Sequence, residues 1–387
     1  MATPLPPTFL FSAESLERSK QRLVAKDPDL MPALDQLIRE ADDYLASGPW
    51  SVMDKEGLPP SGDRHDYKSQ AAYWWPNPDT EDGLPYVSRD GEKNPNSDIW
   101  DGSGWRDLTE ASETLALAYY LTGNGVYGER AATLLRTWYI DEATRMNPHL
   151  EYAQAIPGIW EGYGWGIVDS KVVVPLVDTV GLLQSCDAWT DTDQAAILDW
   201  TKTFLIWLRE SEHGKFESTR PNNHGLHYDL QVISLALFTG QEEIAKEVVG
   251  RAPFWRIGYQ IEHDGRQFYE IARTTGFGYS SGNLAGFFDL AELARWTDID
   301  LWKYSSLDGR SIRKALDFLI PFAQGVEEWR WEEIKGIPMY CPRFASVLRR
   351  AAIGFDEPAY EKVIETIPHL TAEEVASARF NLLYPKA

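Results

Sequence analysis

The chain has 387 residues, 43% of them hydrophobic and 25% charged, and is long enough to bury a large core. Its formal charge of −22 argues against a nucleic-acid-binding surface, which would need a basic patch. No run of residues approaches the roughly 20 apolar positions that a transmembrane helix requires. The composition therefore predicts a globular protein with no membrane span and no nucleic-acid partner, in which a local cluster of Arg, Lys and His would hold an anionic ligand.

The first residues and the two cysteines say little about compartment. Residues 1–7 lack the basic and apolar stretches of a secretory signal. We therefore expect either an intracellular protein or, if a leader has been removed, a secreted or periplasmic one; a polymer-degrading role favours the second. Cys186 and Cys341 allow at most one disulfide and form no metal-binding pattern. The sequence does not fix the oligomeric state.

Helical periodicity recurs along the whole chain, and strand-like alternation is scarce. The clearest helix runs from Leu108 to Thr122 and should end at Gly123, a typical C-cap. Further helices are expected at 31–46, 126–146, 169–184, 192–210, 224–238, 282–296, 311–322 and 359–367. Because the helices follow one another as antiparallel pairs without a clear linker, we predict one all-α domain over residues 1–387. Its expected form is an incomplete (α/α) toroid, a ring of helical hairpins, rather than an open solenoid.

The segment from about residue 48 to residue 104 interrupts this pattern. It contains seven prolines and no sustained helical period. Its many Tyr and Trp residues argue against disorder, and long irregular segments inside compact domains are usually functional. We interpret it as an ordered wall or lid over a cleft.

Residues 61–78 of this segment combine basic and aromatic side chains, namely Arg64, His65, Tyr67, Trp74 and Trp75. Sugar rings pack their apolar faces on Trp and Tyr, and a sugar carboxylate pairs with Arg or Lys. We therefore predict that these residues bind an acidic sugar, together with Arg89 and Trp165. The alternative is a loop pinned by buried aromatic side chains, since many of the 16 Trp residues must serve the core.

Pairs of acidic residues leave open the alternative that the protein is a glycoside hydrolase. Glu110 with Glu113, or Glu161 with Asp169, can flank a sugar bond as two carboxylates do in most glycosidases. Acidic residues are so abundant in this chain that such pairs are expected by chance, so the signal is weak.

Asn222, Asn223 and His224 open an apolar helix. An Asn is well placed there as the N-cap, and the His falls in the first turn. Backbone amides at a helix start also attract anions, so a carboxylate can bind there with help from the side chains.

His227 follows His224 by three residues, and two imidazoles on one helical face can hold a metal. No third ligand has diagnostic spacing, and we predict no metal site.

Arg273 and Tyr279 lie six positions apart with two glycines between them, which predicts a loop or irregular strand. The alternative to a functional role is an Arg paired with Glu270 or Asp264 and a Tyr packed in the core. A phenol has an ordinary pKa near 10, so Tyr279 would act as a base at neutral pH only beside a positive charge. Arg273 or His224 can supply that charge.

The two clusters together suit the removal of a proton next to a carboxylate. Elimination from a sugar acid requires that the charge of the carboxylate be neutralised, so that the neighbouring proton becomes acidic. Amide, imidazole and guanidinium groups can do this. A base and an acid must then act on the reacting carbon atoms, and Tyr279 can do so.

Five motifs follow one another in a fixed order between residues 61 and 280. They are Ser-Gly-Asp-Arg-His-Asp-Tyr, Tyr-Trp-Trp-Pro-Asn-Pro-Asp, Leu-Pro-Tyr-Val-Ser-Arg-Asp-Gly-Glu, Asn-Asn-His and Arg-Thr-Thr-Gly-Phe-Gly-Tyr-Ser. With this ordered set the chain resembles the alginate lyase superfamily of α/α toroid polysaccharide lyases, and polysaccharide lyase family 38 in particular. The likeness spans about residues 50 to 300.

The resemblance implies cleavage of an acidic polysaccharide by β-elimination, without a metal or other cofactor. It implies that Asn223 and Arg273 neutralise the substrate carboxylate and that His224 assists them or acts as a base. Tyr279 would protonate the leaving oxygen and, in a syn elimination, also take the C5 proton.

We therefore expect a lyase acting on a β-1,4-linked polyuronate, with polymannuronate (alginate) ahead of glucuronan, that leaves products with a C4=C5 double bond. Mannuronate and glucuronate differ only at C2, so the catalytic residues do not distinguish them. Two alternatives stay open: a hydrolase of an acidic polysaccharide, and a non-catalytic glycan-binding protein.

Overall fold

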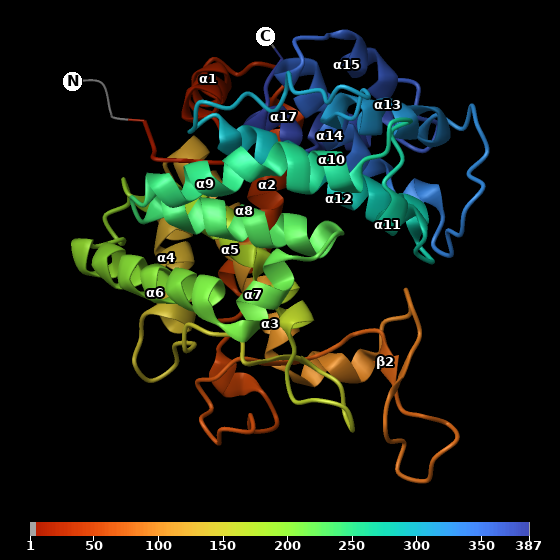
Figure 1. Cartoon of the computed structure of the whole chain (residues 1–387). Coiled ribbons are helices and arrows are strands. Elements are labelled where there is room, and N and C mark those ends of the chain that lie inside the picture. Colours follow the sequence, from red (N-terminus) through yellow and green to blue (C-terminus); the bar gives the residue numbers. More distant parts are fainter. Residues whose placement is uncertain (1–4, 387) are drawn as a thin grey trace. The chain divides into compact units, whose positions relative to one another are not determined.

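The computed structural model describes residues 5–386, which form helices joined by turns and a few very short strands (Figure 1). The all-α prediction is confirmed. Contacts between Cα atoms divide the chain into two compact units. Unit 1 comprises Ile38–Thr219 and Ser234–Gln241 with the segment up to Thr8; unit 2 comprises Phe9–Leu37, Arg220–Ile233 and the chain from Glu242 onward. The single domain and the toroidal ring stay predictions.

Unit 1 contains five complete α-helices and all the strands of the described residues. The helices are α3 (Asp101–Thr122), α4 (Gly125–Tyr139), α5 (Val173–Leu183), α6 (Asp191–Glu210) and α7 (Glu212–Ser218), with the 3-10 helices η1 (Val52–Asp54), η2 (Pro95–Ile99) and η3 (Gly164–Val172). The strands are β1 (Lys68–Gln70), β2 (Trp74–Trp75), β3 (Val87–Ser88) and β4 (Tyr152–Ala155). Strand β1 pairs with β4 in parallel, and β2 pairs with β3 antiparallel.

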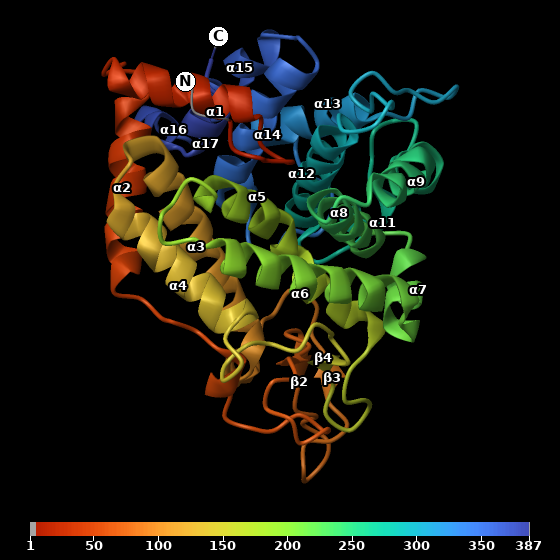
Figure 2. The ribbon, with the colours of Figure 1, turned by 90° about the vertical axis from the view of Figure 1, so that its left-hand side faces the viewer.

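Helices α3 and α4 form an antiparallel hairpin in unit 1 (Figure 2). As predicted, α3 ends at Gly123, which adopts a left-handed conformation with φ of 74°. The Asn124 side chain then accepts a hydrogen bond from the first turn of α4. Trp105 of α3 stacks on Trp138 of α4, with ring centroids 6.0 Å apart, and both rings are buried.

Helix α3 begins at Asp101, seven residues before the expected Leu108, and two further helix boundaries in unit 1 also differ from the prediction. Helix α4 ends at Tyr139 instead of continuing to residue 146, because the chain folds back and the Met146 amide bonds to the carbonyl of Trp138. Helix α5 begins only at Val173, with Pro175 in its first turn, where a missing amide proton does no harm. The 3-10 helix η3 occupies the residues before it.

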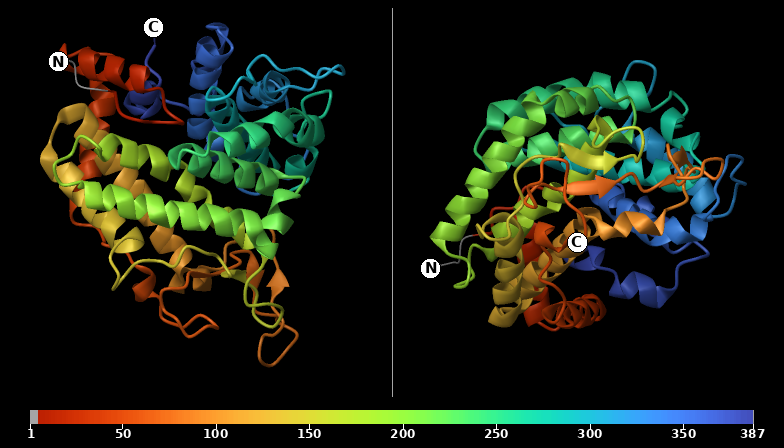
Figure 3. Two further views of the ribbon diagram at one scale, coloured as in Figure 1. Left: turned by 60° about the vertical axis from the view of Figure 1, so that its left-hand side comes forward. Right: turned by 90° about the horizontal axis from the view of Figure 1, so that it is seen from below.

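The segment 48–104 is largely irregular, as predicted, and contains β1, β2 and β3. The loops and short strands of unit 1 gather at one end of its helices (Figure 3). The segment ends earlier than expected, because α3 already begins at Asp101. The carboxylate of Asp101 accepts a hydrogen bond from the Lys68 amide and lies 3.2 Å from the Lys55 ammonium. A buried ion pair thus ties this segment to the start of α3.

Unit 2 contains the remaining complete helices. They are α1 (Ala13–Val24), α9 (Glu242–Ala252), the π-helix η4 (Pro253–Ile257), α10 (Gly258–Gln260), α11 (Phe268–Ile271), α12 (Gly276–Ala294), α13 (Ile312–Ala323), the 3-10 helix η5 (Ile337–Tyr340), α14 (Cys341–Gly354), α15 (Ala359–Ile364), α16 (Ala372–Ser377) and α17 (Phe380–Leu383). Helices α2 (Met31–Leu45) and α8 (Asn223–Phe238) contribute residues to both units. Within unit 2, α12 is lined by buried side chains along its length and packs on α13 and α14.

Two further findings concern membranes and cysteines. Between residues 5 and 386, no helix has both the length and the apolar character needed to cross a membrane. Cys186 and Cys341 are both buried and free, so the disulfide that the sequence would allow is not formed.

Candidate active site

Tyr279 lies in the first turn of α12, not in a loop as its two neighbouring glycines suggested. Its amide donates to the carbonyl of Thr275 over 2.9 Å. The two glycines instead allow neighbouring residues to lie close to the helix backbone. A Cβ at Gly278 would collide with the ring of Tyr340, and one at Gly276 would clash with the carbonyl of Ile271. A helix can therefore begin here directly against its neighbours, with the partly exposed Tyr279 on its outer side.

The side chain of Arg273 contacts that of Tyr279. Nη2 of Arg273 donates to Oη of Tyr279 over 2.9 Å, and the guanidinium carbon lies 3.9 Å from the centre of the ring. Asp264 pairs with Arg266 over 2.7 Å. Tyr279 is not packed in the core. The geometry places a permanent positive charge against the phenol oxygen and ring of Tyr279.

Asn223 is fixed by a buried carboxylate. Oε1 of Glu270 accepts from the main-chain amide of Asn223 over 2.8 Å, and Oε2 accepts from Nδ2 of the same residue over 2.7 Å. Two bonds to one residue fix both the position of its backbone and the rotation of its carboxamide. One Nδ2 proton is thereby used, and the second stays available for an acceptor.

Glu270 connects the two clusters of the sequence. It is 1% exposed. Burial raises its pKa above the ordinary value, against the opposing effects of the two hydrogen bonds from Asn223 and the charges of Arg273 and His224. Its carboxylate therefore lies within electrostatic reach of Arg273 and His224. From the sequence it was considered only as a structural partner of Arg273, and its role in holding Asn223, 47 residues away, was missed.

The capping role considered for Asn222 is not observed. Its side-chain Oδ1 is buried and has no hydrogen-bond partner. Its carbonyl begins the helical bonding of α8 by accepting from the Gly225 amide, and also accepts from Nε2 of Gln260. The helix start is thus held from outside by Gln260 rather than by an Asn side chain.

A chain of buried amides runs from Asn222 to the helix that carries Tyr279. Oε1 of Gln260 accepts from Nδ2 of Asn283 over 3.0 Å, and Oε1 of Gln267 accepts from the same nitrogen over 2.9 Å. Nε2 of Gln267 then donates to the carbonyl of Ser280 over 2.8 Å. These fully buried side chains fix the start of α8 and the first turn of α12 relative to each other, which keeps the site preorganised.

A second brace comes from residues 332–340. Thr275 forms an isolated antiparallel bridge with Glu333, whose Oε2 accepts from the Gly278 amide over 3.1 Å. A carboxylate at the N-terminus of α12 satisfies a free amide and complements the helix dipole. The sequence offered no signal for this contact.

Three of the predicted sugar-binding residues in unit 1 have structural partners. Tyr67 is fully buried, donates to Oδ2 of Asp169 over 3.0 Å and packs on Trp105; this burial does not favour a contact of Tyr67 with substrate, which stays a prediction. Nη1 of Arg64 donates to the carbonyls of residues 53 and 55. Nδ1 of His65 is bonded to the carbonyl of residue 145 over 2.7 Å. These contacts pin the loop, which is the alternative that the sequence left open.

The other predicted sugar-binding residues are more accessible. Trp74 and Trp75 form β2, and the guanidinium of the exposed Arg89 lies 5.0 Å from the centre of the Trp75 ring. A cation and an indole face are thus presented side by side on a small hairpin. Trp165 packs edge-on against Trp160 and Phe216 and is partly exposed. A role of these residues in sugar binding stays a prediction.

One of the two acidic pairs that left a hydrolase open, Glu161 with Asp169, has partners within unit 1. Asp169 accepts from Tyr67, Ser69 and Gln154, so both of its oxygens have internal donors. Glu161 pairs with Lys68 over 3.1 Å. Asp169 therefore acts as an anchor of the loop segment.

Residues 51–329 match the sequence profile of the alginate lyase family. The chain belongs to the alginate lyase family. An alginate lyase from Bacteroides ovatus has a similar crystal structure, with 36% sequence identity and a TM-score of 0.93 over 99% of this chain and 100% of that one. Alginate lyase A1-III from Sphingomonas species A1 shares the fold at 15% identity, with a TM-score of 0.56 over 92% of this chain and 97% of that one. A tyrosine-to-phenylalanine variant of A1-III complexed with a tetrasaccharide is 14% identical, with a TM-score of 0.61 over 100% and 99%. A comparison with curated proteins finds no match.

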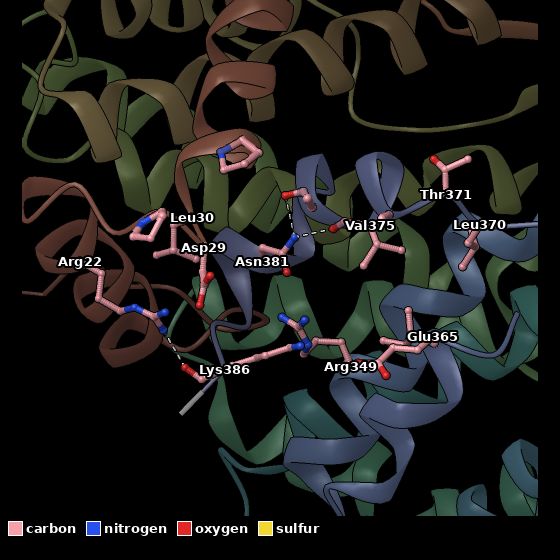
Figure 4. A pocket seen from close by; sticks show the side chains of 15 residues that line it. Arg22, Asp29, Leu30, Arg349, Glu365, Leu370, Thr371, Val375, Asn381 and Lys386 are labelled. Atoms are coloured by element: carbon pink, nitrogen blue, oxygen red, sulfur yellow. Dashed lines mark hydrogen bonds between the residues drawn. The ribbon is translucent and has the colours of Figure 1, made fainter.

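A cavity of about 470 Å³ in unit 2 of this alginate lyase family member lies away from all the residues discussed so far. It is lined by the end of α1 and by the C-terminal helices (Figure 4). Arg22 donates to the carbonyl of Lys386, and Arg349 is ion-paired with Glu361, so both arginines have internal partners.

Among residues 5–386, no group of three or more His, Cys, Asp and Glu side chains is arranged to hold a metal ion.

Proposed function

We propose that this member of the alginate lyase family cleaves β-1,4-linked polyuronate by β-elimination, with polymannuronate preferred over glucuronan. The observation that carries the proposal is the contact of Arg273 with Tyr279, beside an Asn223 held by Glu270. The site thus combines a phenol, a guanidinium and an oriented amide within unit 2. The likeness to the alginate lyase from Bacteroides ovatus over nearly the whole chain supports alginate as the substrate.

The first task of the site is to neutralise the uronate carboxylate. The free Nδ2 proton of Asn223 and the guanidinium of Arg273 are the donors for it, and His224 adds a third. Neutralising the carboxylate stabilises the negative charge that spreads onto it when C5 loses its proton. Donors that are already oriented do this without further reorganisation.

The second task is the elimination itself. The C5–H bond breaks and its proton passes to His224 or to ionised Tyr279. The electron pair left on C5 forms the C4=C5 double bond, and the bond between C4 and the glycosidic oxygen breaks. The protonated Tyr279 gives its proton to that oxygen. Arg273 supports this exchange because its charge keeps the ionised phenol accessible.

The preference for mannuronate must come from contacts outside these four residues. Mannuronate and glucuronate have the same geometry at C4 and C5 and differ only in the C2 hydroxyl. Trp75 and Arg89 of the β2–β3 hairpin, and Trp165, are the candidates that the structure leaves accessible. Because a polymer-degrading role favours a secreted or periplasmic protein, we also expect the enzyme to work outside the cytoplasm.

The test is digestion of separate polymannuronate, polyguluronate and glucuronan samples. We expect the ultraviolet absorbance of an unsaturated uronate to rise as polymannuronate chains shorten, with a smaller rate on glucuronan. Shortening without new absorbance would identify a hydrolase. Binding without shortening would identify a glycan-binding protein.

A further inference from the structure

A short segment of unit 2 exposes an unusual number of aromatic rings. Among residues 5–386, six aromatic side chains count as exposed, and five of them lie between residues 254 and 269. They are Phe254, Trp255, Tyr259, Phe268 and Tyr269, called here the aromatic surface. Phe254 is 69% exposed and Trp255 is 53% exposed. Contiguous exposed apolar side chains mark interaction sites in soluble proteins, whereas single ones do not.

The rings face outward because the opposite side of the segment is anchored. In the π-helix η4, Arg256 points inward, where its Nε and Nη2 bond to the buried carboxylate of Asp229 over 2.7 and 3.0 Å. That contact sets the register and leaves the preceding Phe254 and Trp255 on the outside. Tyr259 returns to the outside one turn later, with its ring centre 6.4 Å from that of Trp255. Single π-helical turns of this kind are often found at functional sites.

The two halves of the aromatic surface are held by one buried amide. Gln260 follows Tyr259, Gln267 precedes Phe268, and both side chains accept from Nδ2 of Asn283. The rings therefore stand on a rigid base instead of a mobile loop. Rigid aromatic rings bind flat apolar faces at little cost in conformational entropy.

The charge around the aromatic surface is compatible with an anionic ligand. From Arg251 to Arg273 the sequence has four arginines and three acidic residues, within a chain of formal charge −22. Arg251 and Arg266 are partly exposed near the rings, each paired with one carboxylate. The segment is thus close to neutral in a strongly acidic chain, so an acidic polymer meets no concentration of negative charge here.

We propose that the aromatic surface is an additional binding site for acidic polysaccharide, on which sugar rings stack against Trp255, Tyr259 and Phe268. The proposal rests on the proposed function for the identity of the polymer. It also uses the continuity of the chain: Tyr269 directly precedes Glu270, which holds Asn223. A polymer bound on these rings is kept at the enzyme between cleavage events, which raises the local concentration of cleavable bonds.

The test compares the full-length double variant Trp255→Ala/Tyr259→Ala with Trp296→Ala, which removes the sixth exposed aromatic ring. Native gels cast with and without polymannuronate report polymer binding through retarded migration. We expect the double variant to lose the retardation and to show a KM for polymer raised about tenfold. Its turnover of a short oligosaccharide should stay at the wild-type level, and the control should match the wild type throughout. Phe268→Ala, on the other half of the aromatic surface, gives an independent reading if the double variant does not fold.

Three outcomes separate the surface from the function. If the wild type forms unsaturated product and the double variant keeps both its retardation and its polymer KM, the aromatic-surface proposal is overturned and the proposed function stands. If no uronan yields unsaturated product but retardation still depends on Trp255 and Tyr259, the function fails and the surface stands. A wild-type dimer in light scattering that the double variant abolishes, with polymer affinity unchanged, would assign the rings to self-association and overturn the proposal.

Discussion

The loop segment 48–104 of unit 1 and the Asn223–Tyr279 cluster of unit 2 are built from similar side chains but use them in opposite ways. In the loop, Arg64 and His65 bond to main-chain carbonyls, and the buried Tyr67 donates a hydrogen bond to the carboxylate of Asp169. In the cluster, the partners of Arg273 and Asn223 are other side chains. A polar group that bonds to main chain is holding a loop. Asn223, held by the Glu270 side chain, still has one Nδ2 proton for a ligand, and Arg273 is held against the partly exposed Tyr279.

The largest expected effect separates the two tyrosines. Tyr279→Phe keeps the ring but removes the transferable proton, so we expect kcat to fall by about 10³-fold or more. The affinity for a mannuronate oligosaccharide, measured by calorimetry, should change little. Tyr67→Phe is the matched control, because it makes the same chemical change in the loop. Near-normal turnover by Tyr279→Phe would show that another group protonates the leaving oxygen.

The next effect tests how the amide is held. In Glu270→Gln one side-chain oxygen becomes an NH₂ group, which faces one of the two donor atoms of Asn223 instead of accepting from it. We expect kcat/KM on polymannuronate to fall by about 10²-fold, as when one preorganised donor is lost. Asp289→Asn is the control, since it makes the same change in an ion pair with Arg350 elsewhere in unit 2. Equal losses in both variants would argue that Glu270 only supports the fold.

The pH dependence of stability gives Glu270 a second, independent signature. Its folded-state pKa is raised, so its contribution to stability is complete below the ordinary value of 4.5 and is lost as pH rises through the raised value. The difference in free energy of unfolding between wild type and Glu270→Gln should therefore shrink as pH rises above 4.5. Urea unfolding at a series of pH values measures it. A difference that grows with pH would mean that the carboxylate is stabilised, not destabilised, by its surroundings.

The smallest effect belongs to the loop. Tyr67→Phe removes one buried hydrogen bond to Asp169, and we expect a loss of about 1 kcal/mol of unfolding free energy. The kcat on polymannuronate should be unchanged when corrected for the folded fraction. Thermal unfolding together with rate measurements on the same samples checks both. A large fall in kcat without loss of stability would return Tyr67 to the list of substrate contacts.

The helical character of the chain was readable from the sequence because local spacing determines it. The spacing of apolar residues and the glycine at 123 predicted α3 and its end, and the other eight expected helices are present, some with an end shifted by up to seven residues. Helices α1, α9 and α14 were not predicted. The start of α12 was misjudged because Gly276 and Gly278 were taken as loop residues. These glycines are needed because the helix start lies in close tertiary contact with Tyr340 and Ile271. A local sequence pattern carries no information about such contacts.

The residues of the site were found by their chemistry, but their supports were not. Arg273 and Tyr279 meet within one short stretch of chain, so their contact follows from nearness in sequence. Glu270 supports Asn223 across 47 residues, and the Gln260–Asn283–Gln267 chain joins three separate elements. Buried amides and carboxylates look alike in a sequence whether they bond to each other or to water. Only their placement in the fold distinguishes them.

The glycine at position 278 has a consequence for how this enzyme can change over time. A methyl group at this position would clash with the ring of Tyr340. The turn that carries Tyr279 and the segment that carries Tyr340 are therefore in close steric contact. A larger residue at position 278 would require a change in the segment that carries Tyr340 as well. We therefore expect new substrate preferences to arise from substitutions elsewhere, which leave this contact unchanged.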